Sequence, residues 1–309
     1  IESLWQIGIR DRRVLSIIKQ MLKAGIMNEC ETSELGTPQG GIISPLLANI
    51  YLNRFDNFIT GDFERKRLQK PHTRRDGELQ AIRKYSNLKT CYYVRYADDW
   101  IILTDSQESA ERLKYKAKRY LKDTLKLELS DEKTLITNVT SKPIKFLGVE
   151  IRMVNKNGTL VNKVSPEKVR FQRKMKSLSR ELFYLRKVAT WNPKRLIQEI
   201  TRVNAIIVGL MNYYSMCDQI SVVIKKYAWL LKYTAYKSLK KFGGKWVRAN
   251  KVSNLIGLHS GHMAHIPAIK YEGMYIGITD INFASWENPR VKNQAENPFT
   301  PEGRERYNK

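Results

Sequence analysis

The chain has 309 residues, enough for two or three domains with apolar cores of ordinary size. Its 55 lysines and arginines against 30 acids give a net charge of +25, which favours a polyanionic partner because neutralising phosphates releases counterions. An aromatic share of 10% argues against a disordered basic tail, and no apolar run is long enough to span a bilayer. Three widely spaced cysteines and the lack of a signal peptide indicate a protein of the bacterial cytoplasm or an organelle, not a secreted one.

The first segment, residues 1–28, places apolar side chains at helical spacing, and Asp11 is expected to cap its second half. Residues 35–41 form a loop that ends on two adjacent glycines. Residues 42–53 then have the pattern of a helix, with Ser44 as its cap and a proline in its first turn. Glycines before a helix let backbone N–H groups approach a phosphate or a sugar, but a tight turn leading into a core helix explains the same residues.

Two runs of strand-forming residues, 92–97 and 100–103, flank the adjacent acids Asp98 and Asp99. The pattern predicts a β-hairpin with both carboxylates at or near its tip. Carboxylate oxygens, with water and substrate phosphates, are the ligands that Mg²⁺ prefers, and two such ions can stabilise a phosphoryl displacement. The alternative is that the two acids merely supply turn residues.

The segments around this hairpin predict further elements. Residues 60–90 are polar and are expected to form a surface insertion. Residues 107–127 have the pattern of an amphipathic helix, residues 127–134 lead into a short strand, and residues 144–151 alternate as a strand broken by a glycine. The Asn-Gly pair at 157–158 is typical of a hairpin turn.

From Ser165 onward the pattern becomes helical. Ser165 is expected to cap a first helix with Pro166 at its first helical position, and three helices are predicted over roughly 166–188, 194–215 and 219–242.

This helical region is strongly basic. Residues 167–251 contain 20 lysines and arginines against 4 acids, a net charge of +16. Aromatic residues are interleaved with these charges, namely Phe171, Tyr184, Tyr213, Tyr214, Tyr227, Trp229, Tyr233 and Tyr236. Basic side chains for phosphates and aromatic faces for bases favour a nucleic-acid groove. The alternative is a bundle whose aromatic residues are core and whose lysines are only solvated.

Together, these segments resemble the reverse transcriptases encoded by group II introns, also called maturases. Residues 96–99 are similar to the catalytic palm hairpin of that family, and residues 37–52 resemble its nucleotide-binding loop and helix. Lys133 falls where the family carries the lysine of the following palm motif, and residues 146–148 are similar to its primer-gripping hairpin. The basic stretch of about 165–245 is similar to the thumb, or maturase domain, which in this family binds intron RNA.

The resemblance implies a set of site residues. Asp98, Asp99 and Lys133 would be catalytic, and the two aspartates would hold two Mg²⁺ ions. The nucleotide- and template-binding residues would be Thr37, Pro38, Gln39, Gly40 and Gly41. The primer grip would be Phe146, Leu147 and Gly148. The RNA-binding residues would be Arg170, Arg173, Lys174, Lys176, Arg180, Lys225 and Lys226.

The fold expected from this resemblance is α+β. A right-hand polymerase palm, an antiparallel sheet with helices, would occupy residues 1–160, followed by an all-α thumb bundle over 161–245. A small mixed tail over 246–309 would be a DNA-binding or linker region. The chain opens on Ile1, and the further aspartate that the family carries on an upstream palm strand has no counterpart in it. We therefore expect a carboxy-terminal piece that alone does not extend a primer.

The function expected is that of an RNA-directed DNA polymerase and maturase, which binds its intron RNA to assist splicing and retrohoming. Its partners would be structured intron RNA, a DNA target or primer, and dNTPs, with no membrane, and the sequence leaves the oligomeric state open. An RNA-binding splicing cofactor with little or no polymerase activity is the first alternative. A reverse transcriptase attached to a bacterial defence system is a second, which an adjoining defence domain upstream would favour.

Overall fold

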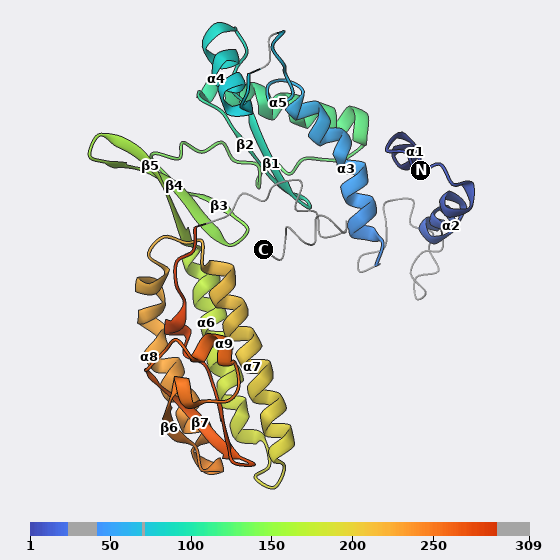
Figure 1. Ribbon diagram of the computed structural model, residues 1–309. Coiled ribbons are helices and arrows are strands. Elements are labelled where there is room, and N and C mark those ends of the chain that lie inside the picture. The colour runs from blue at the N-terminus through green and yellow to red at the C-terminus, as the bar shows by residue number, and fades with distance from the viewer. Residues whose placement is uncertain (24–41, 70–71, 289–309) are drawn as a thin grey trace. The chain divides into compact units, whose positions relative to one another are not determined.

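The computed structural model of the protein describes residues 1–23, 42–69 and 72–288 (Figure 1). The chain divides into two compact units, Ile1–Asn138 and Val139–Lys309. Helices and antiparallel strands occur in both units, so the mixture of the two that the sequence predicts is confirmed. The predicted nucleotide-binding residues 37–41 lie outside the described residues.

The first unit combines a two-stranded hairpin with helices that cover it (Figure 1). Its described elements are α1 (Glu2–Gln6), α2 (Arg12–Lys23), α3 (Ser44–Thr60), α4 (Arg75–Tyr85), β1 (Tyr92–Tyr96), β2 (Asp99–Leu103) and α5 (Gln107–Leu125). The helix α5 buries one stripe of side chains at helical spacing, Leu113, Ala117, Leu121 and Leu125. That stripe shares an apolar core with α3, in which the ring of Phe55 is fully buried.

The N-terminal helices α1 and α2 form a separate small core with the start of α3. Leu4, Leu15 and Ile18 are its buried members. The predicted helix over residues 1–28 is thus two helices, because the backbone between them turns at Gly8 with a φ of 101°. Asp11 caps the second helix as predicted, since its Oδ1 accepts a hydrogen bond from the backbone N–H of Arg13 at 2.8 Å.

Three other expectations for the first unit were wrong. Ser44 is the first residue of α3 and not its cap, because Ile43 before it already has helical dihedral angles. Residues 60–90 are not only a surface insertion, since they contain α4, whose Glu78 and Ile82 are buried. Residues 127–134 do not lead directly into a strand, since the next strand begins only at Ile144. That stretch instead turns at residues 131–133, where Thr134 N–H bonds to the Ser130 carbonyl at 3.0 Å.

The second unit packs a helical bundle with two small sheets (Figure 1). Its strands are β3 (Ile144–Phe146), β4 (Val149–Lys156), β5 (Thr159–Pro166), β6 (Lys245–Arg248), β7 (His265–Tyr271) and β8 (Met274–Gly277). Its α-helices are α6 (Lys168–Tyr184), α7 (Pro193–Tyr214), α8 (Ile220–Leu239) and α9 (Ile256–His259). Short 3₁₀ helices are η1 (Leu185–Lys187), η2 (Lys240–Phe242), η3 (Ala249–Lys251) and η4 (Ile281–Phe283).

One continuous apolar core runs through this unit. It joins the inner faces of α6, α7 and α8 to strand β7 and to η4, so the described part of residues 246–288 packs on the bundle. Figure 1 shows β6 and β7 lying along α8. Among the described helices, none is both long and apolar enough to cross a membrane.

The three long helices lie where the sequence predicts them, but two local expectations were wrong. Residues 144–151 form two antiparallel strands and not one, because the chain reverses at Leu147 and Gly148. The helix α6 begins at Lys168 after Glu167, while Pro166 still belongs to β5, so Ser165 does not cap it. The predicted turn at Asn157 and Gly158 is confirmed, since both residues have positive φ between β4 and β5.

Candidate active site

The hairpin β1–β2 places the acidic pair at its tip, as predicted. Tyr96 and Asp99 are the last pair of the ladder, so Ala97 and Asp98 form the two-residue turn. Ala97 has a φ of 51°, a left-handed conformation that strains a residue with a Cβ by about 1–2 kcal/mol. Such strain persists only where surrounding contacts hold it, and it is concentrated at functional sites.

The carboxylates of Asp98 and Asp99 are both exposed. In the described part of the chain, no hydrogen bond or ion pair occupies either of them. Two adjacent, solvent-accessible carboxylates without a compensating cation fit the oxygen ligands that Mg²⁺ prefers. The same described residues hold no cluster of three or more histidine, cysteine or acidic side chains. The turn therefore offers two metal ligands from this part of the protein.

A network that the sequence did not predict holds the turn. Arg95, on β1, forms a two-pronged ion pair with Asp56 on α3, in which Nε and Nη2 each lie 2.7 Å from a carboxylate oxygen. Its Nη1 donates to the Asn49 side chain on α3 and to the Ala97 carbonyl in the turn, both at 2.8 Å. The hydrogen bonds to Asp56 raise the pKa of Arg95 above its usual range, so the guanidinium stays charged.

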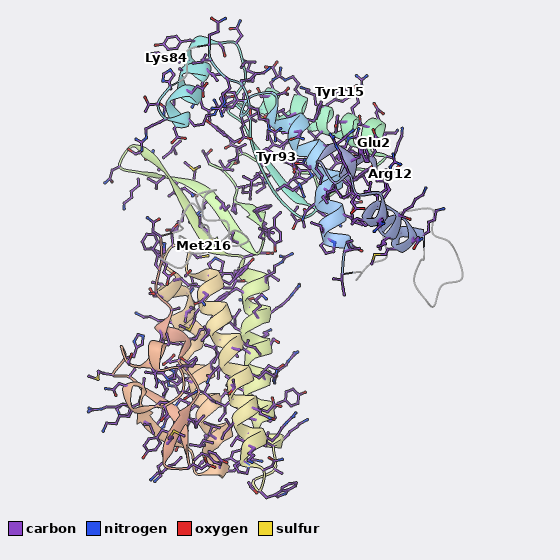
Figure 2. All side chains as sticks on the ribbon, turned by 45° about the vertical axis from the view of Figure 1, so that its right-hand side comes forward. Glu2, Arg12, Lys84, Tyr93, Tyr115 and Met216 are labelled. Atoms are coloured by element: carbon purple, nitrogen blue, oxygen red, sulfur yellow. The ribbon has the colours of Figure 1, made fainter. Side chains whose placement is uncertain are left out.

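Tyr93 adds a second attachment between the hairpin and α3 (Figure 2). Its hydroxyl donates to Asp56 at 2.9 Å, and its ring meets Phe55 edge-on at 5.7 Å. Burial, and then the hydrogen bond to Asp56, raise the pKa of Tyr93 above its usual range. Trp100 on β2 also meets the ring of Phe55 at 5.6 Å. Both strands of the hairpin are therefore fixed to the helix that directly follows the predicted nucleotide-binding loop.

Lys133 lies in the turn at residues 131–133 and is exposed. The turn is tied to α5 because Lys118 pairs with Asp131 at 2.5 Å and Lys114 donates to the Thr134 carbonyl at 2.8 Å. Within the described residues, Lys133 itself has no ion pair or hydrogen bond. Its amine is therefore accessible to a ligand. The predicted catalytic role of Lys133 stays a prediction.

The predicted primer-grip residues lie where β3 meets β4, with Phe146 ending β3 and Leu147 and Gly148 forming the turn. Leu147 and Gly148 have φ values of 49° and 80°, and Gly148 is the residue that adopts this conformation without strain. The Gly148 carbonyl accepts from the Glu167 N–H at 2.9 Å, and the Leu147 carbonyl accepts from the Tyr213 hydroxyl. The turn is thus fastened to the start of α6 and to the end of α7.

Comparison with known proteins matches both parts of the chain. Residues 1–151 match the family model described as reverse transcriptase (RNA-dependent DNA polymerase), and residues 159–267 match the type II intron maturase model. The group II intron-encoded protein LtrA of Lactococcus lactis is 30% identical over 295 residues, covering 77% of this chain and 49% of that protein. The chain belongs to the family of group II intron-encoded reverse transcriptases. It spans about half the length of this curated relative.

Two further relatives are similar over shorter spans. An uncharacterized 91 kDa protein in the cob intron of Schizosaccharomyces pombe is 29% identical, over 67% of this chain and 31% of that protein. Protein YkfC of Escherichia coli is 32% identical, over 52% of this chain and 45% of that protein. The group II intron assignment thus agrees with an intron-encoded relative in a fungus as well as one in a bacterium.

The maturase segment of this family member carries the predicted RNA-binding residues on helix surfaces. Four basic side chains of α6, Arg173, Lys174, Lys176 and Arg180, are exposed and have no ion pair within the described residues. Arg170 is exposed too, but its Nε lies 3.2 Å from Glu167. Lys225 and Lys226 are exposed on α8. The apolar stripe of α6 faces the core instead, through Phe171, Met175, Leu178 and Leu182.

The interleaved aromatic residues divide between core and surface, which corrects the expectation that they share one groove. Phe171 and Tyr214 are buried and meet edge-on at 5.1 Å, so they belong to the core. Trp229 and Tyr233 lie on α8 with exposed fractions of 71% and 40%, and their rings stack at 5.3 Å with an interplanar angle of 6°. Lys237 lies over the Tyr233 ring at 5.3 Å. The maturase segment therefore presents an exposed, stacked aromatic pair beside a basic side chain.

Proposed function

We propose that the hairpin tip is the catalytic centre of an RNA-directed DNA polymerase, and that residues 1–160 correspond to most of a right-hand palm. The observation that carries this proposal is the exposed pair Asp98 and Asp99, held at a strained turn that Arg95 fastens to α3. A pair that served only as turn residues would need no such attachment. Family membership supports the same reaction, because residues 1–151 match the reverse transcriptase family.

The proposed reaction is nucleotidyl transfer. The primer 3′-hydroxyl oxygen forms a bond to the α-phosphorus of a dNTP. The bond between that phosphorus and the oxygen that bridges it to the β-phosphorus breaks, so that pyrophosphate leaves and the hydroxyl loses its proton. Asp98 and Asp99 would hold two Mg²⁺ ions, which when bound stabilise charge on the attacking and leaving oxygens. Their ligand shells require more oxygens than these two side chains supply, and the family's upstream aspartate would provide one of them.

Other residues of this chain would bind and orient the reactants. Gln39 and Gly40 would contact the incoming nucleotide and template, at the start of the segment that leads into α3. Lys133, whose amine is exposed, would donate a proton to the leaving pyrophosphate or screen its charge. The turn at Phe146, Leu147 and Gly148 would grip the primer, supported by its hydrogen bonds to Glu167 and Tyr213.

Residues 161–245 of the second unit would be the thumb, or maturase domain, and would bind structured intron RNA. The net charge of +16 over residues 167–251 supports this proposal, as do the unpaired basic side chains of α6. These charges are independent of the carboxylates at the hairpin tip. A second candidate function, an RNA-binding splicing cofactor with little polymerase activity, is favoured by the same surface. Splicing and retrohoming would then be activities of the whole intron-encoded protein with its RNA.

Replacing both aspartates tests the proposal. In the full-length protein, Asp98→Ala combined with Asp99→Ala should abolish cDNA synthesis, because the substitutions remove the two metal ligands, while RNA affinity stays nearly unchanged. Primer extension and filter binding with the intron RNA measure the two properties. Asp105→Ala is the matched control, since Asp105 is also exposed but lies beyond β2. Synthesis by the double variant within about tenfold of wild type would contradict the assignment.

A further inference from the structure

Nearly all hydrogen-bond donors of the Arg95 side chain are occupied. A guanidinium group has five N–H donors, and four of those of Arg95 are occupied, two by Asp56, one by Asn49 and one by the Ala97 carbonyl. The side chain is only 10% exposed, and its bonds to Asp56 are part-buried, whereas those to Asn49 and Ala97 lie at the surface. A lysine at this position could pair with Asp56, but its single nitrogen could not reproduce a planar fork to acceptors on both sides.

Of these acceptors, the Ala97 carbonyl is the one that lies in the turn with the acidic pair. The Ala97 carbonyl belongs to the peptide that joins Ala97 to Asp98, and Ala97 is the strained residue with a φ of 51°. A bond to this carbonyl fixes the plane of that peptide and hence the direction in which the next side chain leaves the backbone. The bond therefore acts on Asp98 without touching its carboxylate.

The charge of Arg95 is already balanced. Asp56 receives two bonds from the guanidinium and a third from the Tyr93 hydroxyl, so the ion pair is satisfied within the hairpin and α3. Among the described residues, Arg95 forms no hydrogen bond or ion pair with either carboxylate of the acidic pair. What Arg95 contributes to the site is therefore a fixed conformation of the turn, and not a compensating charge.

We propose that Arg95 is a positioning residue for the reaction, which fixes the Ala97–Asp98 peptide relative to α3. Because the same guanidinium binds Asn49 on α3 and the Ala97 carbonyl in the turn, Arg95 couples the placement of the carboxylates to that of α3. This inference rests on the proposed function for its catalytic consequence. Its structural consequence, an ordered turn, does not depend on that function.

The experiment compares two Arg→Lys variants of the full-length protein. Arg95→Lys keeps the charge beside Asp56 but loses the bond to Ala97. Arg75→Lys is the matched control, because Arg75 binds the buried carboxylate of Glu78 and the backbone carbonyls of Glu64 and Lys66, away from the hairpin tip. Each variant is measured for kcat and KM in primer extension, for thermal midpoint, and for hydrogen exchange of the amides at residues 97–99.

Arg95→Lys should lower kcat by about 10–100-fold with KM for the template-primer nearly unchanged, as for other residues that orient metal ligands. Exchange at residues 97–99 should become at least about fivefold faster. Arg75→Lys should change neither kcat nor the exchange rates at residues 97–99, even if it lowers the thermal midpoint as much as Arg95→Lys does. If both variants lose activity in proportion to stability, or if Arg95→Lys keeps kcat and exchange within about twofold of wild type, the positioning role is overturned. If wild type synthesises no DNA, the proposed function fails, while the exchange rates still decide whether Arg95 orders the turn.

Discussion

The buried carboxylate of Glu78 stabilises the first unit only while it is charged. The Leu68 N–H donates to its Oε1 at 2.9 Å, and the guanidinium groups of Arg67 and Arg75 bind its Oε2. These hydrogen bonds, the backbone one foremost, lower the pKa of Glu78 from 4.5 to about 2. Since the folded-state pKa lies below that of the unfolded chain, the stabilisation is complete above pH 4.5 and is lost as the pH falls through about 2.

We therefore predict that Glu78→Gln flattens the acid limb of the stability curve. The thermal midpoint of the wild-type protein should fall between about pH 5 and about pH 2 more steeply than that of the variant, because only the wild type must protonate Glu78. Differential scanning calorimetry across this range measures the difference. Glu128→Gln serves as the control, since Glu128 is exposed. Equal slopes for wild type and Glu78→Gln would show that these bonds do not stabilise the charged form.

Single residues of the candidate site differ in how visible they are from the sequence. Asp98 and Asp99 could be predicted because they adjoin each other within a local strand–turn–strand pattern. The network around Arg95 could not be predicted. Its partners Asn49 and Asp56 lie 46 and 39 positions earlier in the chain, and they meet Arg95 only once β1 packs on α3. An arginine one residue before a tyrosine in a strand has no local feature that indicates an ion pair.

Among the elements, long periodic helices were predictable and their ends were not. The apolar stripes of α5, α6 and α7 follow the helical period over several turns, so their positions are fixed by sequence. The expected caps Ser44 and Ser165 failed because the neighbouring backbone, helical at Ile43 and extended through Pro166, decides where a helix begins. Likewise, alternation over residues 144–151 cannot distinguish one strand from a tight hairpin.

The stacked pair on α8 leads to a prediction about single-stranded RNA. Trp229 and Tyr233 present parallel, exposed rings, and a base that stacks on such a ring contributes about 1–3 kcal/mol. Trp229→Ala and Tyr233→Ala should each weaken binding of a single-stranded RNA by roughly 5–150-fold, without changing the slope of log affinity against log salt. Fluorescence anisotropy at several salt concentrations measures both quantities.

The control for this prediction is another exposed aromatic residue. Tyr115 lies on α5 of the first unit and is 66% exposed (Figure 2). Tyr115→Ala should leave the affinity for single-stranded RNA unchanged. If Trp229→Ala and Tyr233→Ala also leave it unchanged, the stacked pair has another role, such as covering by a protein partner.

Across the whole molecule, the candidate catalytic residues and most of the net positive charge lie in different units. The acidic pair and its network lie in the first unit, whereas 16 of the 25 net positive charges fall within residues 167–251 of the second. Within the described residues, each apolar core belongs to one unit only. Substitutions in one core should therefore change the stability of the other unit little, because sites without shared partners are usually additive.

This division predicts that the two proposed activities can be separated. Neutralising Arg173, Lys174 and Lys176 to Gln in the full-length protein should reduce the slope of log RNA affinity against log salt by about one unit for each lost phosphate contact. Arg170→Gln should reduce it less, since Arg170 already pairs with Glu167. Lys122→Gln, at an exposed position on α5, is the control and should leave the slope unchanged.

The same triple variant decides how far synthesis depends on the basic surface. With a short template-primer supplied in excess, primer extension by the triple variant should stay near the wild-type rate, because Asp98, Asp99 and their attachment through Arg95 are intact. The double aspartate variant should show the opposite pattern, with RNA binding and splicing support preserved and synthesis lost. An unchanged salt slope in the triple variant would mean that these side chains are only solvated. Loss of both activities in either variant would mean that the carboxylates and the basic helices act as one site.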